Sequence, residues 1–213
     1  KKRGINIISF SNKKKADIFL LNTKRIKKNY RLKIKVKNKI FYFITKYSTE
    51  NFIKNILACI STMYVLNLNL SKMKEKFFNF KIPEGRGDIN IVNKFKKRFK
   101  LIDESYNANP LSMSSAINNM NYYTHNKKYR KLIFLGDMLE LGKRSKKLHR
   151  NLSILINRSN IDKVFVYGKY IRETFNYLSS SKKGEIFMNL EEAYTHLSKI
   201  LHNNDLLMIK GSN

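Results

Sequence analysis

Two short segments rich in acidic and amide side chains contain the residue types that could bind a charged ligand. The first is Asp103-Glu-Ser-Tyr-Asn-Ala-Asn-Pro110, and the second is Gly136-Asp-Met-Leu-Glu-Leu-Gly142. Asn109 is a good N-cap and Pro110 a good first helical residue, so a helix should begin where the first segment ends. The free amide groups and partial positive charge of such an end suit an anionic ligand. A plain capped turn is the alternative, and these residues leave both interpretations open.

The second segment looks like a phosphate-binding loop, but its spacing excludes that chemistry. Five residues separate Gly136 from Gly142, one more than the motif allows. Arg144 also stands after Lys143, where a Ser or Thr would hold Mg²⁺. The four histidines have no metal-ligand spacing, so we expect no metal site in this chain. His149 is expected to pack on a helix.

Strand and helix patterns alternate regularly around both segments. The expected strands are Phe99–Asp103, Lys131–Gly136, Lys163–Tyr167, Glu185–Met188 and Asp205–Ile209. The expected helices are 110–123, 144–157, 169–179 and 190–202. Continuously apolar strands such as Leu132–Leu135 are typical of a sheet covered on both faces. The pattern predicts an α/β fold, a Rossmann-like, open and mostly parallel sheet with flanking helices, whose ligands bind beyond the carboxyl ends of the strands.

The first part of the chain has a different pattern. Short apolar runs separated by basic and Asn-rich turns predict strands at Ile5–Phe10, Asp17–Leu21, Tyr30–Val36 and Ile40–Ile44, the last two antiparallel. Apolar spacings of three and four predict helices at Glu50–Leu66 and Ser71–Phe80, the second with Ser71 as N-cap. Pro83-Glu-Gly-Arg-Gly87 interrupts the helical pattern. We therefore expect domains at 1–82 and 88–213, joined by a hinge at 83–87.

Composition excludes some classes of protein. The apolar share of 42% indicates a globular chain, and no apolar run is long enough to span a membrane. The first residue is Lys1 rather than Met, so we expect the chain to begin inside a longer protein. A net charge of +29 is compatible with a basic nucleic-acid-binding module. That function would need basic side chains gathered on one face, and the strand-like repeats suggest no such grouping. We expect weak binding to polyanions but no specific nucleic-acid partner.

The combined order and spacing of these motifs resembles Mur ligases of the D-alanyl-D-alanine-adding kind. The resemblance rests on Gly85-Arg86, Ile102–Pro110, Leu135–Gly142 with His149 beyond it, and Lys210-Gly-Ser212. It identifies residues 88–213 as the family's C-terminal domain. Residues 1–82 look like the last part of its central ATP-binding α/β domain, where Asn55-Ile-Leu-Ala58 resembles an Asn-Ala-Leu-Ala helix.

The resemblance implies an ATP-dependent ligase of peptidoglycan precursor synthesis. Such an enzyme activates the carboxylate of UDP-N-acetylmuramoyl-tripeptide as an acyl phosphate, and the amine of D-Ala-D-Ala then attacks it. ATP and Mg²⁺ are the implied cofactors, with the phosphate loop and metal ligands in an N-terminal part that this chain lacks. The implied enzyme is cytoplasmic and monomeric, and the chain alone is inactive. A catalytically inactive remnant of such a ligase is the alternative.

The resemblance also assigns roles to individual residues. It places Asn55, Arg86, Asp103, Glu104 and Tyr106 near the nucleotide, with Arg86 as a catalytic group at the hinge. It places Asn107, Asn109, Lys210 and Ser212 on the substrate side. The family usually has Asp where Glu104 stands, so either Asp103 or Glu104 could meet the nucleotide. Asn51-Phe52 replaces the family's His-Asn.

Overall fold

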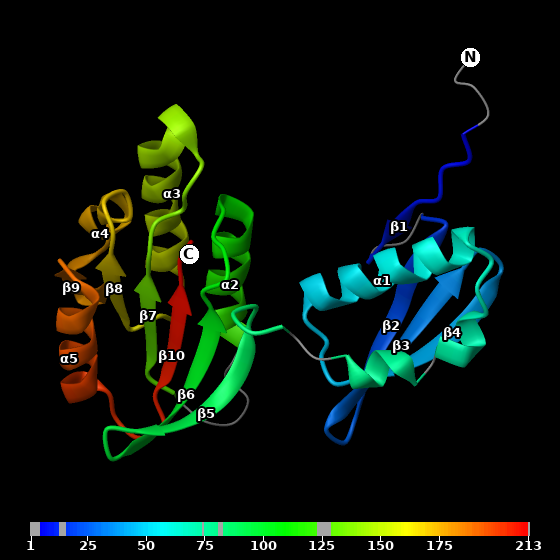
Figure 1. Ribbon diagram of the computed structural model, residues 1–213, viewed down its shortest axis with the longest axis horizontal. Coiled ribbons are helices and arrows are strands. Elements are labelled where there is room, and N and C mark those ends of the chain that lie inside the picture. Colours follow the sequence, from blue (N-terminus) through cyan, green and yellow to red (C-terminus); the bar gives the residue numbers. More distant parts are fainter. Residues whose placement is uncertain (1–4, 13–15, 74, 81–82, 123–128, 213) are drawn as a thin grey trace. The chain divides into compact units, whose positions relative to one another are not determined.

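The structure is a computed structural model that describes residues 5–12, 16–73, 75–80, 83–122 and 129–212. The chain divides into two compact units, Lys1–Lys81 and Ile82–Asn213. The first unit is coloured blue to cyan in Figure 1, and the second is coloured green to red.

The first unit is a four-stranded sheet with helices packed on one face. Its strands lie in the order β1 (Phe10–Ser11), β2 (Ile18–Ile26), β3 (Asn29–Val36) and β4 (Lys39–Thr45). β3 and β4 are antiparallel, as the sequence predicted, and α1 (Glu50–Val65) confirms the predicted helix. The predicted strand Ile5–Phe10 is wrong except at Phe10, which pairs with Ile18. The other five residues of that run lie outside any strand despite their apolar content.

The predicted helix Ser71–Phe80 is also wrong. Its described residues form two 3₁₀ turns, η1 (Leu70–Met73) and η2 (Lys76–Asn79), and Lys74 lies outside the described residues. Ser71 is not an N-cap, because its own backbone N–H donates to the Asn69 side-chain carbonyl at 3.0 Å. Asn69 thus forms a local side-chain-to-backbone turn that competes with a continuous helix.

Side-chain alternation along β3 separates an apolar face from a basic one. Leu32, Ile34 and Val36 are buried in a core that α1 completes. Arg31, Lys33 and Lys35 alternate with them and so point to the opposite face. The sequence argument that basic side chains do not gather on one face is therefore wrong for this sheet. The period of two residues in a strand brings them together, and such a face attracts polyanions without reading their sequence.

The second unit is a six-stranded sheet in the order β5-β6-β10-β7-β8-β9. The mostly parallel α/β fold and all five predicted strands are confirmed as β6 (Lys97–Glu104), β7 (Lys131–Leu135), β8 (Lys163–Tyr167), β9 (Lys183–Phe187) and β10 (Leu206–Lys210). The sequence missed β5 (Asp88–Lys94), an edge strand that pairs antiparallel with β6. Its Ile89 and Ile91 side chains are exposed, so β5 lacks the buried apolar pattern of the other strands.

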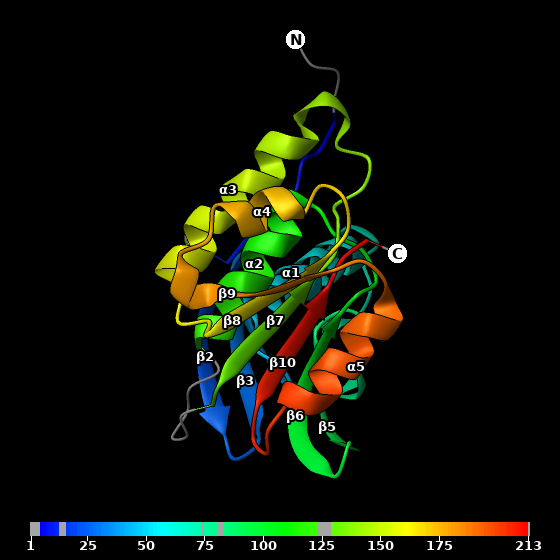
Figure 2. The same cartoon turned by 90° about the vertical axis from the view of Figure 1, so that its left-hand side faces the viewer.

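Helices cover both faces of this sheet. Figures 1 and 2 show α2 (Pro110–Tyr122), α3 (Ser145–Arg158) and α4 (Arg172–Asn176) on one face and α5 (Leu190–Ile200) on the other. Two separate apolar clusters correspond to these two layers. Every residue of β7 is buried, as expected for a covered strand. α4 is much shorter than the predicted 169–179, because the chain before it forms a loop held by Asp137.

The register of the parallel strands places the ends of β6, β7 and β10 side by side. Lys210 at the end of β10 pairs with Glu104 of β6 on one side and with Leu135 of β7 on the other. Since these strands are parallel, the segments that follow Glu104, Leu135 and Lys210 all leave the same edge of the sheet. The two motif segments of the sequence therefore meet at this edge.

Candidate functional site

A buried lysine organises the segment that follows β6. Lys210 is only 2% exposed. Its Nζ donates to the backbone carbonyls of Glu104 at 3.3 Å and Asn107 at 3.0 Å, and it lies 3.4 Å from Glu104 Oε2. The Lys210 side chain thus holds the backbone of the turn at 104–107, which belongs to the first motif segment. The structure places Lys210 beneath this turn, where it positions the turn's backbone.

The Glu104–Lys210 pair is held where burial works against both charges. Burial raises the pKa of the Glu104 carboxyl, although the Lys210 ammonium partly opposes the rise. Burial likewise lowers the pKa of Lys210, and Glu104 partly opposes that change. Asp103 and Asp88 add repulsion that also raises the pKa of Glu104. The Glu104 carboxyl therefore differs electrostatically from an ordinary surface glutamate.

Asp103, the other carboxylate of the motif, has a local role in the structure. Its Oδ1 accepts hydrogen bonds from the Ser105 N–H at 3.0 Å and the Ser105 hydroxyl at 2.6 Å. Its backbone carbonyl accepts from the Gly87 N–H at 2.7 Å. Asp103 thus shapes the turn in which Glu104 lies. Which of the two carboxylates meets a nucleotide stays open.

The Gly85-Arg86-Gly87 segment is attached to the same turn. The Tyr106 N–H donates to the Gly85 carbonyl at 3.1 Å, across from the bond that Gly87 makes with Asp103. Gly85 and Gly87 have φ values of 71° and 91°, in the region that glycine tolerates best. A Cβ at Gly87 would lie 2.7 Å from Glu104 Oε1. Glycine at this position therefore leaves space for the Glu104 carboxylate.

Arg86 is exposed and stacks on an aromatic ring. Its guanidinium carbon lies 4.1 Å from the centroid of the Tyr106 ring. Within the described residues, Arg86 forms no ion pair with Glu84, Asp88 or any other carboxylate. A stacked guanidinium keeps its in-plane N–H groups free for an anion. The structure thus brings Arg86, Tyr106 and Glu104 close to one another.

Replacing Gly85 by alanine should disrupt this attachment. The added Cβ would lie 2.9 Å from the Tyr106 backbone nitrogen at a left-handed φ, so both a clash and strain result. We expect a loss of about 2–3 kcal/mol in unfolding free energy, measured by urea denaturation followed by circular dichroism. Gly142→Ala is the matched control, because Gly142 has φ 54° but open space around its Cβ position. Equal losses in the two variants would mean that the contact with Tyr106 is unimportant.

The predicted substrate-side residues come from the turn before α2 and from the end of β10. Asn109 Oδ1 accepts from the Ser112 N–H at 2.9 Å, which confirms the predicted cap ahead of Pro110. The Ser212 hydroxyl lies 3.2 Å from the Ala108 carbonyl, to which it donates, and 3.4 Å from Asn107 Oδ1. Asn107 and Ser212 are therefore neighbours, although they are far apart in sequence. Asn55 is exposed on α1 in the other unit.

The loop after β7 is held by a buried histidine. His149 of α3 is fully buried, and its Nε2 accepts from the Met138 N–H at 2.9 Å. Its Nδ1 lies 2.8 Å from the Ser145 carbonyl and must donate to it, which fixes a neutral tautomer. The expectation that His149 packs on a helix is confirmed. Its contact with Met138 also positions the residue that follows Asp137.

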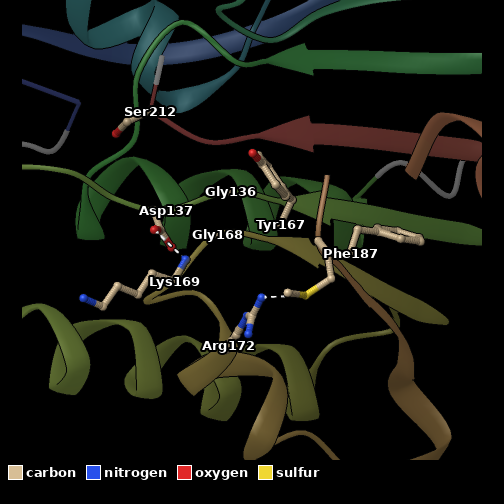
Figure 3. A pocket seen from close by; sticks show the side chains of 9 residues that line it. Gly136, Asp137, Tyr167, Gly168, Lys169, Arg172, Phe187 and Ser212 are labelled. Atoms are coloured by element: carbon tan, nitrogen blue, oxygen red, sulfur yellow. Dashed lines mark hydrogen bonds between the residues drawn. The ribbon is translucent and has the colours of Figure 1, made fainter. Parts of the chain in front are cut away.

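A pocket of about 530 Å³ opens beside this loop, and the sequence did not identify it. Figure 3 shows Asp137, Lys169, Arg172, Tyr167 and Ser212 around it. Gly136-Asp137 follows β7 and Gly168-Lys169 follows β8, so these residues meet at the carboxyl edge of the sheet. The rule that ligands bind at this edge could have directed attention to both dipeptides. Lys169 and Arg172 had no recognisable motif around them.

No cluster of three His, Cys, Asp or Glu side chains in the described part of the chain is arranged to hold a metal ion. Asp88, Asp103 and Glu104 lie near each other, but Asp103 is engaged with Ser105 and Glu104 with Lys210.

Comparison with known proteins identifies the fold family. The model of the "Mur ligase, glutamate ligase domain" matches residues 89–213, which are more than half of the chain. The chain belongs to the Mur ligase family. This Mur ligase chain is 28% identical over 208 residues to the UDP-N-acetylmuramoyl-tripeptide–D-alanyl-D-alanine ligase of Rickettsia prowazekii, covering 97% of the chain and 44% of that protein. It is 33% identical to the ligase of the same name from Buchnera aphidicola subsp. Baizongia pistaciae, covering 95% and 42%.

Solved structures show the same Mur ligase fold at lower identity. The MurF crystal structure from Acinetobacter baumannii has a TM-score of 0.78 at 18% identity, covering 96% of this chain and 43% of that one. MurF from Thermotoga maritima, in complex with ADP, has a TM-score of 0.73 at 20% identity, covering 96% and 44%. The Mur ligase chain therefore spans less than half the length of these relatives. In the described residues, no helix is both long and apolar enough to cross a membrane.

Proposed function

We propose that this chain is the C-terminal portion of a cytoplasmic ligase that adds D-alanyl-D-alanine to UDP-N-acetylmuramoyl-tripeptide in peptidoglycan precursor synthesis. The observation that carries the proposal is the cluster of Arg86, Tyr106, Glu104 and Lys210 at the carboxyl edge of the sheet. These residues belong to the motifs that resemble this kind of Mur ligase. The names of the two bacterial relatives, which align along nearly the whole chain, support the same activity.

The first unit is proposed to be the last part of the central ATP-binding domain, with 83–87 as the hinge. Residues 88–213 would then be the C-terminal domain. The two compact units, which meet between Lys81 and Ile82, and the family match to residues 89–213 are compatible with these bounds. The full-length protein would be monomeric. This assignment would place Asn55 on the nucleotide side of the central domain.

Arg86 suits the phosphates of a nucleotide, because it stacks on Tyr106 and forms no ion pair among the described residues. ATP supplies the phosphoryl group that activates the tripeptide carboxylate as an acyl phosphate. Arg86 would bind phosphate oxygens through its free in-plane N–H groups while Tyr106 holds the guanidinium flat. Lys210 keeps Glu104 and Asn107 in position for these contacts. Mg²⁺ would bind to residues outside this chain.

The isolated chain should neither release ADP from ATP nor form the amide. The reason is that no stretch of the sequence fits a phosphate loop, without which the transferred phosphoryl group is not positioned. Coupled measurement of ADP release and product amide, with the full-length ligase as positive control, tests the expectation. Mg²⁺-dependent ADP release by the pure chain would contradict it. If the full-length protein is also inactive, the chain is part of a catalytically inactive remnant.

A further inference from the structure

We propose that the open face of the sheet in the first unit docks on the surface of a membrane that contains anionic lipids. The open face is the one opposite the core that α1 completes. Strand register places on it Arg31, Lys33 and Lys35 of β3, Phe19 of β2, and Ile40 and Tyr42 of β4. None of these side chains belongs to the apolar core of the unit. The inference goes beyond the proposed ligase activity and does not depend on it.

The positive charge of this face is not neutralised within the sheet. Residues 18–45, which span β2, β3 and β4, contain nine lysines and arginines and no acidic residue. Arg31, Lys33 and Lys35 form no ion pair among the described residues. They alternate along one strand, so neighbouring members of the row lie about 6–7 Å apart at their Cα atoms. Like charges at this spacing repel each other, and an anionic surface would offset that repulsion.

Exposed apolar side chains lie among these cations. Ile40 is 49% exposed and pairs in register with Lys35, whereas Tyr42 is 45% exposed and pairs with Lys33. A purely ionic partner would leave both of these apolar side chains in water. The interface of a membrane accepts both kinds of group, because apolar side chains enter the headgroup layer while lysine and arginine contact anionic lipids. The mixture therefore favours a lipid surface.

A nucleic acid fits this face less well than a lipid surface does. Proteins that bind single strands stack the bases on aromatic rings. Here the protein's own cations lie over the rings. The Arg31 guanidinium carbon is 5.7 Å from the Tyr42 ring centroid, and Lys35 Nζ is 5.9 Å from the Phe19 ring centroid. Bases would have to displace these cations, and Ile40 would add nothing to contacts with phosphates.

The first test is cosedimentation of the 213-residue chain with vesicles of equal parts phosphatidylglycerol and phosphatidylcholine at physiological ionic strength. The chain should bind these vesicles, and it should bind vesicles of phosphatidylcholine alone much more weakly. A triple variant with Arg31→Gln, Lys33→Gln and Lys35→Gln should bind the anionic vesicles about a hundredfold more weakly, because each basic side chain near an anionic surface strengthens binding about fivefold. The matched control removes the same charges from exposed positions of the second unit, by Arg144→Gln, Lys146→Gln and Lys147→Gln. Its affinity should stay near that of the wild type.

A second variant tests the apolar contact separately from the charge. Ile40→Thr combined with Tyr42→Thr keeps every cation and removes apolar surface, with a residue that strands accept well. It should weaken binding to the anionic vesicles about tenfold. Its binding to a single-stranded oligonucleotide should be unchanged, because phosphate contacts do not use these side chains. All variants should melt near the wild-type temperature by circular dichroism, since the replaced side chains lie outside the core.

Several outcomes would overturn the proposal: equal binding to the two kinds of vesicle, wild-type affinity in the triple variant, or unchanged vesicle binding in the double variant. Tighter binding to the oligonucleotide than to the anionic vesicles, lost in the triple variant, would make the face a nucleic-acid surface instead. The full-length protein is measured in parallel and should bind the same vesicles. Binding by the 213-residue chain that the full-length protein lacks would mean that the rest of the protein covers this face, and the proposal would then be wrong.

Discussion

Replacement of Arg86 by alanine in the full-length ligase should reduce turnover roughly a hundredfold, equivalent to about 3 kcal/mol of transition-state stabilisation. The guanidinium is exposed, stacked on Tyr106 and unpaired with any described carboxylate, so it is available to phosphate oxygens. Charge on those oxygens increases during phosphoryl transfer, and contacts of that kind lower the barrier more than they aid substrate binding. Steady-state kinetics measures the effect, and a thermal melt of the same samples should change little.

Two further variants test whether the expected loss of turnover is specific to the Arg86 guanidinium. Arg86→Lys keeps the charge but loses the planar group that stacks, so its turnover should be intermediate. Arg150 provides a matched control, because its guanidinium lies 4.3 Å from the Tyr177 ring centroid on another surface of the same unit. Arg150→Ala should leave turnover near normal. Normal turnover in Arg86→Ala, or a fall in melting temperature that matches the activity loss, would refute a catalytic role for Arg86.

Replacement of Lys210 by methionine should destabilise the second unit by about 3 kcal/mol. The ammonium group holds two backbone carbonyls and the Glu104 carboxylate, and all three would lose their donor at once. The estimate is at the low end for a broken buried pair, because the Glu104 side chain is still 23% exposed. Urea denaturation at neutral pH, followed by circular dichroism, measures the loss. Lys146→Met, at an exposed position of α3, should have little effect.

The loss caused by Lys210→Met should depend on pH in a defined direction. Burial already raises the pKa of Glu104 from its ordinary value of 4.5, and removal of Lys210 raises this pKa further. When folding raises the pKa of a carboxyl, the folded protein becomes more stable as the pH falls, because the folded state binds more protons than the unfolded state. The deficit of the variant should therefore shrink as the pH falls through the raised pKa of the folded variant toward 4.5, and it should change no further below 4.5. A deficit that does not change with pH would mean that the unpaired Glu104 charge is not its cause.

Much of the second unit could be predicted from its sequence because its strands are short, apolar and covered. Strand β5 was missed for an identifiable reason. The turn that joins it to β6 has Phe95 and Lys96 both at φ 56°, where a two-residue hairpin normally contains glycine, asparagine or aspartate. Without that signal, and with Ile89 and Ile91 exposed, nothing local indicated a strand.

The site could be predicted in part, and tertiary register accounts for most of the rest. The motif residues identified Glu104 and Lys210 separately, but their contact depends on β10 lying between β6 and β7. Strand order is not encoded in the spacing of strands along the chain. The pocket lined by Asp137, Lys169 and Arg172 was missed because it forms where the loops after β7 and β8 meet, and that meeting follows from strand order. Asn55 and the hinge are still predictions.

The central place of β10 ties the folding of the second unit to the order of its synthesis. β6 ends at Glu104 and β7 at Leu135, which are 102 and 71 residues before β10 begins at Leu206. Both strands therefore wait for their shared neighbour during synthesis.

 Until then, the nascent chain holds two strands whose facing edges lack a partner, and such edges invite pairing with other chains. The cluster around Glu104 is likewise incomplete until Lys210 has left the ribosome. The second unit therefore reaches its complete sheet, and the cluster its buried lysine, only after β10 has been synthesised.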